Sequence, residues 1–131
     1  MLNEWDRPLH LKRFEAKTKA QKVASLETVI RDLDGMAADL LQQIAAEEER
    51  TKVRDERRRD YSMVALAAAI RRRKLMVSLA ELKASLETAT RDHAAAEVAV
   101  RDLELARRTP SELQPGTVRP RTVARSGKAD V

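Results

Sequence analysis

Apolar residues recur along two long stretches of the chain at alternating spacings of three and four. The first seam consists of Val23, Leu26, Ile30, Leu33, Ala37, Leu40 and Ile44. The second consists of Leu75, Leu79, Leu82, Leu86, Ala89, His93, Ala96, Val100 and Leu103. This spacing is the heptad pattern of a coiled coil, in which positions a and d form the buried seam. Each seam covers at least three heptads, which favours a coiled coil over an ordinary surface helix.

Proline and glycine mark the limits of the helical region. Residues 9–109 contain no proline and a single glycine, Gly35, and a proline inside a helix costs about 3 kcal/mol. Pro8 suits the first turn of a helix, where its missing N–H is not needed. The other three prolines lie in residues 109–131, which are polar and basic. We therefore expect helix within residues 1–108 and a disordered basic tail over 109–131.

Between the seams, the heptad positions of residues 47–61 are polar. One continuous helix would need a partner chain along its length, whereas a hairpin lets the chain bury its own seam. We expect an all-α fold, a long antiparallel two-helix coiled-coil hairpin with arms at residues 8–57 and 62–108 and a turn near 58–61. A heptad seam is satisfied equally well within one chain or between two, so a two-chain scaffold stays open as an alternative.

Antiparallel pairing leaves two registers, one heptad apart. In the first, Ile44 faces Leu75 and Glu47 faces Arg72, with the turn centred near Arg59. In this register the carboxylate of Glu47 is a partner for Arg72. We prefer it for that reason, because a buried base without a partner is costly.

In the second register, Ile30 faces Leu82 and Leu33 faces Leu79, but Leu40 then meets Arg72 with no acid beside it. Gly35 occupies the outermost heptad position, f, in either register. We interpret it as a tolerated exposed glycine, which costs about 1 kcal/mol against alanine. A bend, or the close approach of a partner's backbone, is the alternative interpretation.

The composition supports helices and excludes several classes of protein. Alanine contributes 21 residues, leucine 15 and the charged types 47 of the 131, a mixture typical of long helices and coiled coils. The absence of cysteine excludes disulfides and thiolate metal sites and favours a reducing compartment. The longest apolar run, residues 63–70, is far below the roughly 20 residues of a membrane span. The acidic start is unlike a signal peptide, so we expect a cytoplasmic protein.

The charges are segregated along the chain. Residues 50–74 hold ten bases and three acids, net +7, whereas the stretches on either side, 1–49 and 75–106, are each net −3. The proposed tip carries a basic cluster and one aromatic, namely Arg57, Arg58, Arg59 and Tyr61. We favour docking of this tip on an acidic protein surface. Nucleic-acid binding is less expected, because sequence-tolerant binders add aromatic stacking platforms, and a solvated cluster without a partner is the third interpretation.

No group of residues in the sequence suggests a reaction. His10 and His93, the two histidines, lie in different arms, and the run Glu47, Glu48 and Glu49 places its carboxylates on different sides of a helix. There is no glycine-rich phosphate loop, and a two-helix hairpin lacks the concave pocket that catalysis usually needs. We expect a protein that is not an enzyme, with no metal site, no cofactor and no small-molecule substrate.

Several segments resemble a known family. The chain reads Leu-His-Leu-Lys-Arg-Phe at residues 9–14, Met-Ala-Ala-Asp-Leu at 36–40 and Gln-Ile-Ala-Ala-Glu-Glu-Glu-Arg-Thr at 43–51. These segments, with further matches at residues 72–87, resemble the FliJ family of flagellar export proteins, in particular its α-proteobacterial branch. The resemblance covers about residues 8–106. The Leu-Lys-Arg-Phe start and the Ala-Ala-Glu-Glu-Glu-Arg-Thr run are its most specific parts.

The resemblance implies an antiparallel coiled-coil stalk of the type III export apparatus, similar to the central stalk of rotary ATPases. Such a stalk inserts into the ring of the export ATPase, promotes its hexamerisation and links it to the membrane export gate. Its location would be cytoplasmic, peripheral to the membrane through its partners. Export chaperones are further implied partners, and the equivalent injectisome stalk is a close variant of this interpretation.

By analogy with rotary stalks, the open end of the hairpin would enter the ring. That end carries the six residues that we assign to ring contact, Leu9, Leu11, Lys12, Phe14, Arg107 and Arg108. Better-known members contact the gate through aromatic side chains on an outer face, where this sequence has polar residues or alanine. We therefore assign no gate-contact residue. A nucleic-acid-associated coiled coil and a scaffolding coiled coil are the alternative functions.

Overall fold

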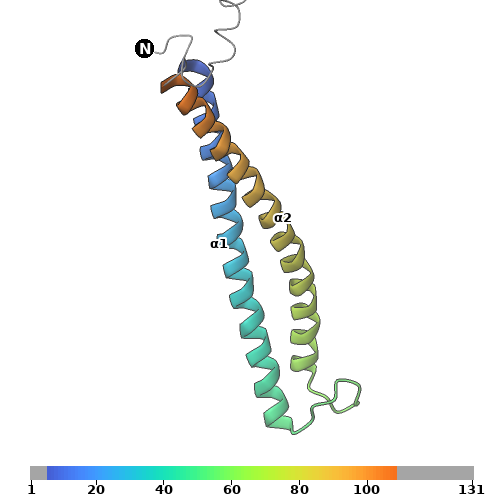
Figure 1. The fold of residues 1–131 in the computed structure, drawn as a ribbon. Helices are drawn as coiled ribbons and strands as arrows, with labels where there is room; N and C mark the ends of the chain where they lie inside the picture. Colours follow the sequence, from blue (N-terminus) through green and yellow to red (C-terminus); the bar gives the residue numbers. More distant parts are fainter. Residues whose placement is uncertain (1–5, 109–131) are drawn as a thin grey trace, which may run out of the picture. The chain divides into compact units, whose positions relative to one another are not determined.

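The computed structural model describes residues 6–108, which form two α-helices, α1 (Asp6–Thr51) and α2 (Met63–Arg108) (Figure 1). Each helix has 46 residues, about 69 Å of helix at a rise of 1.5 Å per residue. The helices pack against each other as an all-α helical hairpin, which confirms the predicted fold class. The tail that we expected to be disordered, 109–131, lies outside the described residues.

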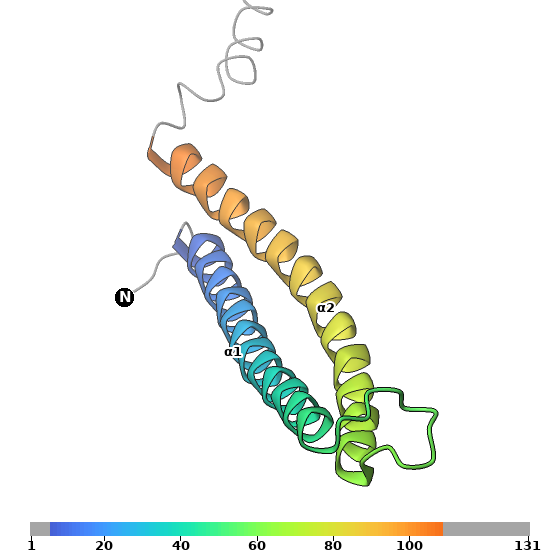
Figure 2. The ribbon, with the colours of Figure 1, turned by 90° about the horizontal axis from the view of Figure 1, so that it is seen from below.

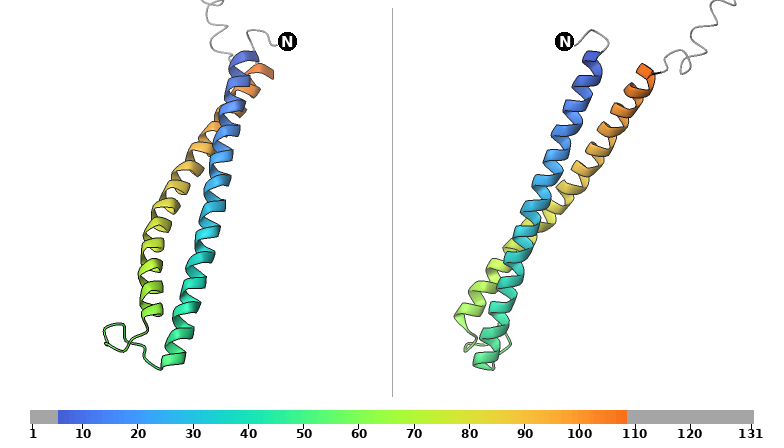
Figure 3. Two further views of the ribbon diagram at one scale, coloured as in Figure 1. Left: turned by 180° about the vertical axis from the view of Figure 1, so that it is seen from behind. Right: turned by 90° about the vertical axis from the view of Figure 1, so that its left-hand side faces the viewer.

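The helices build two compact units. One, which we call the loop unit, consists of residues 20–92 and includes the connection between the helices. The other, the terminal unit, combines residues 6–19 with 93–108. In both, a stretch of α1 lies beside a stretch of α2 that runs in the opposite direction, as the further views also show (Figures 2 and 3). Within residues 6–108, neither helix is long and apolar enough to cross a membrane.

The seam of the loop unit is buried as its periodicity predicts. All seven residues of the first seam are buried or half-buried, and every residue between them is exposed. Leu79 of α2 is 1% exposed and forms one cluster with Ile30 and Ala37 of α1. Gly35 is exposed, and a Cβ added to it would meet nothing within 4 Å. It is therefore an outward-facing helical glycine without a close neighbour in the described part of the chain.

The register that we preferred is wrong. Ile44 packs against the cluster of Val53, Tyr61 and Ala65, whereas Leu75 packs against the separate cluster that contains Leu79. Leu79 clusters with Ile30 and Ala37, which flank Leu33. Both arrangements fit the second register. In that register Leu33 faces Leu79, and Ile44 faces position 68, which lies one helical turn from Ala65.

Arg72 is the base that the preferred register would have paired with Glu47, and it is left partly unpaired in the structure. Its Nε is buried without a hydrogen-bond partner in residues 6–108, while the residue as a whole is only half-buried. A long arginine side chain can bury its stem and keep its charged head near water. Glu47, the expected partner, bonds to Ser62 and Arg50 instead.

The connection is longer than we expected, because α1 ends at Thr51 and α2 begins at Met63, whereas the arms were placed at 8–57 and 62–108. Lys52 adopts φ of 63° and donates its N–H to the carbonyl of Glu48 at 2.8 Å. This is the αL motif that terminates a helix, usually with glycine at the left-handed position. Because a lysine occupies this position instead of glycine, the sequence did not indicate that the helix ends at Thr51.

The terminal unit has its own small seam. Leu9, Ala16 and Ala96 are buried, with exposed fractions of 4, 4 and 7%. Two ion pairs join its helices, one from Arg13 Nη2 to Glu104 Oε2 at 2.9 Å and one between Arg107 and Asp6. Small alanines at the seam allow the two backbones to approach closely, and the ion pairs lie at its edges.

Candidate docking surfaces

The residues that we assigned to ring contact lie in the terminal unit and divide by exposure. Leu11 is 60% and Phe14 67% exposed, although both are large and apolar. Leu9 is only 4% exposed, because it belongs to the seam of its own hairpin. Leu11 and Phe14 therefore present apolar side chains to solvent, and Leu9 does not.

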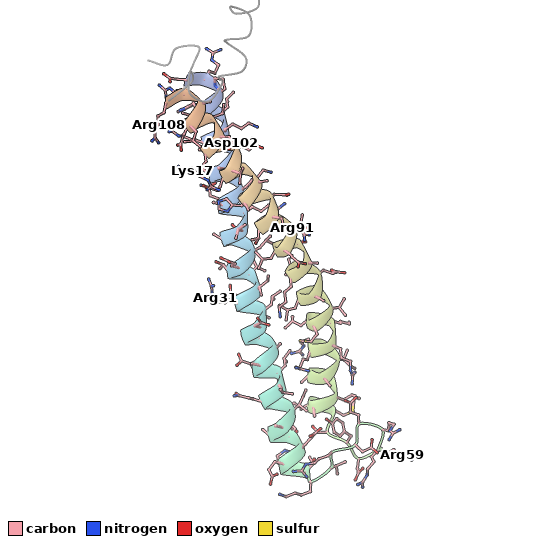
Figure 4. The ribbon with its side chains drawn as sticks, in the orientation of Figure 1. Lys17, Arg31, Arg59, Arg91, Asp102 and Arg108 are labelled. Atoms are coloured by element: carbon pink, nitrogen blue, oxygen red, sulfur yellow. The ribbon has the colours of Figure 1, made fainter. Side chains whose placement is uncertain are left out.

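The charged members of the same group are exposed and differ in their contacts. Lys12 lies 3.5 Å from Glu15, one helical turn away. Arg107 pairs with Asp6, and Arg108 is exposed at the end of α2 (Figure 4). The three cations thus add positive charge to the surface of the terminal unit, and carboxylates offset that of Lys12 and Arg107.

The three arginines of the predicted tip lie on the connection and point outward. Arg57 Nε lies 3.3 Å from Asp55 Oδ1, and Arg58 Nη2 lies 2.8 Å from Asp60 Oδ2. Arg59 extends from the connection away from the helices, with no ion pair in the described part of the chain (Figure 4). The cluster is accessible, but carboxylates within the connection neutralise two of its three charges locally.

Tyr61, the fourth predicted tip residue, faces inward. It is 5% exposed and packs with Val53 and Ala65. Its phenol donates a hydrogen bond to Glu48 Oε2 at 2.6 Å. This hydrogen bond, together with burial, raises the pKa of Tyr61 to about 12. Tyr61 therefore fixes the connection to α1, and its ring is not exposed for stacking or docking.

Ser62 forms the second attachment of the connection. Its hydroxyl accepts the N–H of Ala65 at 3.1 Å, which is the N-cap bond of α2. The same hydroxyl donates to Glu47 Oε1 at 2.6 Å. The hydrogen bond from Arg50 and then that from Ser62 lower the pKa of Glu47. One serine thus caps α2 and ties its start to α1.

The acidic run has different partners at each position, as its helical spacing predicts. Glu47 bonds to Ser62 and Arg50, Glu48 bonds to Tyr61, and Glu49 pairs with Lys52 and Arg54. We did not predict that Glu47 and Glu48 hold the connection. A serine directly before the apolar run 63–70 is an N-cap signal that could have located the start of α2. No local pattern identifies the contact between Glu48 and Tyr61, because it joins residues 13 apart across the connection.

A second basic cluster, Arg71, Arg72, Arg73 and Lys74, lies two turns into α2 and differs from the cluster on the connection. Arg73 pairs with Glu56, which attaches the connection to α2. Arg71 and Lys74 are exposed and make no ion pair with any described residue. Only part of the positive charge of residues 50–74 is therefore available to a partner.

The described surface offers little for a metal or a small molecule. Residues 6–108 contain no group of three or more His, Asp or Glu side chains that could hold a metal ion. A hollow on α2 is lined by Lys83, Ala84, Leu86, Glu87, Thr90 and Arg91. All six belong to one helix, so the hollow is a shallow stretch of helix surface.

The same fold can serve unrelated functions, so a function has to be argued from the surfaces themselves. Comparison of the chain with protein-family models, curated proteins and solved structures finds no match.

Proposed function

We propose that the chain is a non-catalytic stalk of the flagellar type III export apparatus. It inserts into the ring of the export ATPase, promotes its hexamerisation and links the ring to the membrane export gate. The observation that carries the proposal is the helical hairpin whose heptad seam is buried within one chain. This is the architecture that the resemblance to the FliJ family implies.

The proposed ring contact is the exposed part of the terminal unit. Leu11 and Phe14 supply apolar area at its surface, and Lys12 and Arg108 supply positive charge. Large exposed apolar side chains bordered by charges are a common feature of protein interfaces. Leu9 is not included in this surface, since its side chain is buried.

The connection is the proposed contact for an acidic partner surface. Arg57, Arg58 and Arg59 are exposed there, and Arg59 has no ion pair in the described chain. The export gate and export chaperones are the candidate partners that the resemblance implies. The proposed location is cytoplasmic, at the membrane export apparatus and through these partners only.

The test is reconstitution with the cognate export ATPase at near-physiological salt. The wild-type chain should bind the ATPase, increase its hexamer population and raise its turnover. A double variant, Leu11→Asp with Phe14→Asp, should lose both effects and keep its helical circular dichroism, since both residues are more than half exposed. Val29→Asp is the matched control, because it places a carboxylate at a 43% exposed apolar position of the loop unit.

Failure of the wild-type chain to bind the ATPase would overturn the proposal. If the double variant still binds the ATPase, the proposed function stands, but the terminal unit is not the ring contact. Both outcomes can be read from one titration with sedimentation of the complex.

A nucleic-acid-associated coiled coil is the second candidate, and the exposed bases Arg59, Arg71 and Lys74 favour it. Their phosphate contacts would give binding that weakens by orders of magnitude between low and moderate salt. The buried ring of Tyr61 argues against base stacking at this site. Electrophoretic mobility shifts over a salt series, with and without charge reversal at Arg59, distinguish this candidate from the stalk.

A further inference from the structure

Two features of the structure are unfavourable, and both follow from the way in which α2 is aligned with α1. Arg72 Nε is buried without a hydrogen-bond partner in residues 6–108, because Leu40 faces it in the observed register. Lys52 adopts φ of 63°, a left-handed conformation that is unfavourable for residues other than glycine. A movement of α2 along α1 by one heptad would relieve both.

This movement shifts α2 by seven residues, about 10.5 Å along the helix axis, toward the connection. Leu40 then faces Leu79 instead of Arg72, so an apolar contact replaces an unfavourable one. Glu47, which is half-buried, comes to face Arg72, and its carboxylate can accept the unpaired N–H. The slid register therefore has an ion pair at the seam where the observed register has a base without a partner.

The connection can follow the movement because α1 can lengthen. The observed connection, residues 52–62, is centred on residue 57, whereas the slid register centres the turn near Arg59. Residues 52–57 contain neither glycine nor proline, so α1 can continue through them. Lys52 then adopts the ordinary right-handed conformation of a helix.

Contacts of the connection with α1 hold the observed register. The phenol of Tyr61 donates to Glu48 at 2.6 Å, and the hydroxyl of Ser62 donates to Glu47 at 2.6 Å. A slide of one heptad carries the start of α2 away from both carboxylates. Glu47 therefore bonds to Ser62 in one register and faces Arg72 in the other.

Further contacts favour the observed register. The slide replaces Leu86 by His93 opposite Leu26. It also separates three ion pairs that join the helices, namely Asp34–Lys83, Arg13–Glu104 and Asp6–Arg107. The observed register is therefore the more stable state, and the slid register is the minor state of a two-state equilibrium.

We propose that the hairpin is a two-state device in which α2 slides along α1 by one heptad and the connection acts as the latch. In the observed state, the hydrogen bonds of Tyr61 and Ser62 close the latch. In the slid state these bonds are open and Arg72 pairs with Glu47. Because the same slide separates the ion pairs of the terminal unit, opening of the latch and release of those pairs are coupled reciprocally. The inference does not depend on the proposed function, because it involves neither the ATPase nor the gate.

Disulfide trapping in the full chain distinguishes the two states, since the chain contains no cysteine. Ala37→Cys with Leu75→Cys is the observed-state pair, because these positions face each other in the structure's register. Ala37→Cys with Leu82→Cys is the slid-state pair. Ala37→Cys with Ala89→Cys is the control pair, which closes only after a slide of two heptads or after unfolding. Two cysteines can bond only when their Cα atoms lie within about 7 Å, less than the shift of one heptad.

The rates of disulfide formation in a mild oxidant, read by non-reducing electrophoresis, should fall in a fixed order. The observed-state pair should close first, then the slid-state pair, and the control pair last. Circular dichroism checks that each variant is helical before oxidation, and Ile30→Cys with Ala89→Cys is a second slid-state pair that keeps Leu82. Tyr61→Phe should accelerate the slid-state pair about tenfold, because it removes a bond with a charged acceptor from the latch.

A charge exchange separates sliding from unfolding, because residues 47 and 72 face each other only in the slid register. With Glu47 present, Arg72→Glu brings two carboxylates together in the slid state, whereas with Glu47→Arg it restores an ion pair. The effects of Arg72→Glu on the slid-state pair should therefore differ at least about tenfold between the two backgrounds, and the control pair should show no such coupling. A slid-state pair that closes no faster than the control pair overturns the inference, as does the absence of this coupling or of any response to Tyr61→Phe.

Discussion

The hydrogen bond from Tyr61 to Glu48 should contribute measurably to the stability of the loop unit. The Tyr61→Phe variant removes the hydroxyl and leaves the ring, which is 5% exposed, in its place. The lost bond, 2.6 Å long, has a charged acceptor, and such bonds contribute about 1.5–3 kcal/mol. Glu48 is half-buried, so water can rehydrate part of the freed carboxylate. We therefore expect a loss of about 1.5 kcal/mol in the free energy of unfolding, at the lower end of that range.

The contribution should depend on pH in a defined direction. The hydrogen bond to Glu48 and burial raise the pKa of Tyr61 from 10.0 to about 12, so the folded state binds the phenolic proton more tightly than the unfolded state. The stabilisation is therefore fully present below pH 10 and is lost as the pH rises through 12. The stability difference between wild type and Tyr61→Phe should shrink over this interval.

Two measurements check these expectations. Urea denaturation followed by circular dichroism gives the free energies of unfolding at neutral and alkaline pH. The chain contains one tyrosine, so the ultraviolet absorbance of the ionised phenol reports the pKa of Tyr61 directly. Glu48→Gln is the control, since it keeps an acceptor oxygen but removes the charge, and should move the pKa back toward 10. A phenol that ionises near pH 10 while the helices remain folded would refute the reasoning, as would equal stability of Tyr61→Phe and wild type at neutral pH.

Further substitutions test the seam, the cap and the helix ends by urea denaturation. Leu79→Ala should cost about 2–5 kcal/mol, because the side chain is 1% exposed, whereas Val77→Ala at a 61% exposed position should cost under about 0.5 kcal/mol. Ser62→Ala should cost about 1 kcal/mol through loss of the N-cap, and Ser62→Thr, which keeps a hydroxyl, should cost less. Lys52→Gly should be about 1 kcal/mol more stable than Lys52→Ala, since both lack the amine and only glycine relieves the left-handed backbone. Gly35→Ala should stabilise the chain by about 0.5–1 kcal/mol, and no gain would mean that the position does not tolerate a methyl group.

The seam shows which features of the fold the heptad pattern predicts and which it does not. A helix turns by a fixed angle per residue, so apolar spacing alone decides which residues share a face. Ile30, Ala37 and Leu79 were assigned to the seam on this basis, and all three are buried. The same periodicity cannot distinguish registers one heptad apart, because a shift of seven residues again places apolar residues opposite one another.

The candidate functional residues also differ in how well their exposure was predicted from the sequence. Leu9, Leu11 and Phe14 were assigned to ring contact from their place at the open end of the hairpin, and Leu11 and Phe14 are exposed whereas Leu9 is buried. Whether they contact an ATPase ring stays a prediction. Tyr61 was placed at the tip from its position in the sequence, but its ring is buried, because Glu48 offers its hydroxyl a hydrogen bond 13 residues away. Contacts of that kind depend on the path of the connection and leave no trace in local spacing.

The sequence by itself determined that two long helices form and which face of each is buried, because both follow from local propensity and heptad spacing. Only the tertiary structure decided where the helices end and how they are aligned. The left-handed turn at Lys52, the cap at Ser62 and the bond of Tyr61 fix the length of the connection. That length sets the register, even though it leaves Arg72 Nε without a partner in residues 6–108. The connection decides between the registers because the apolar seams accommodate both nearly equally well.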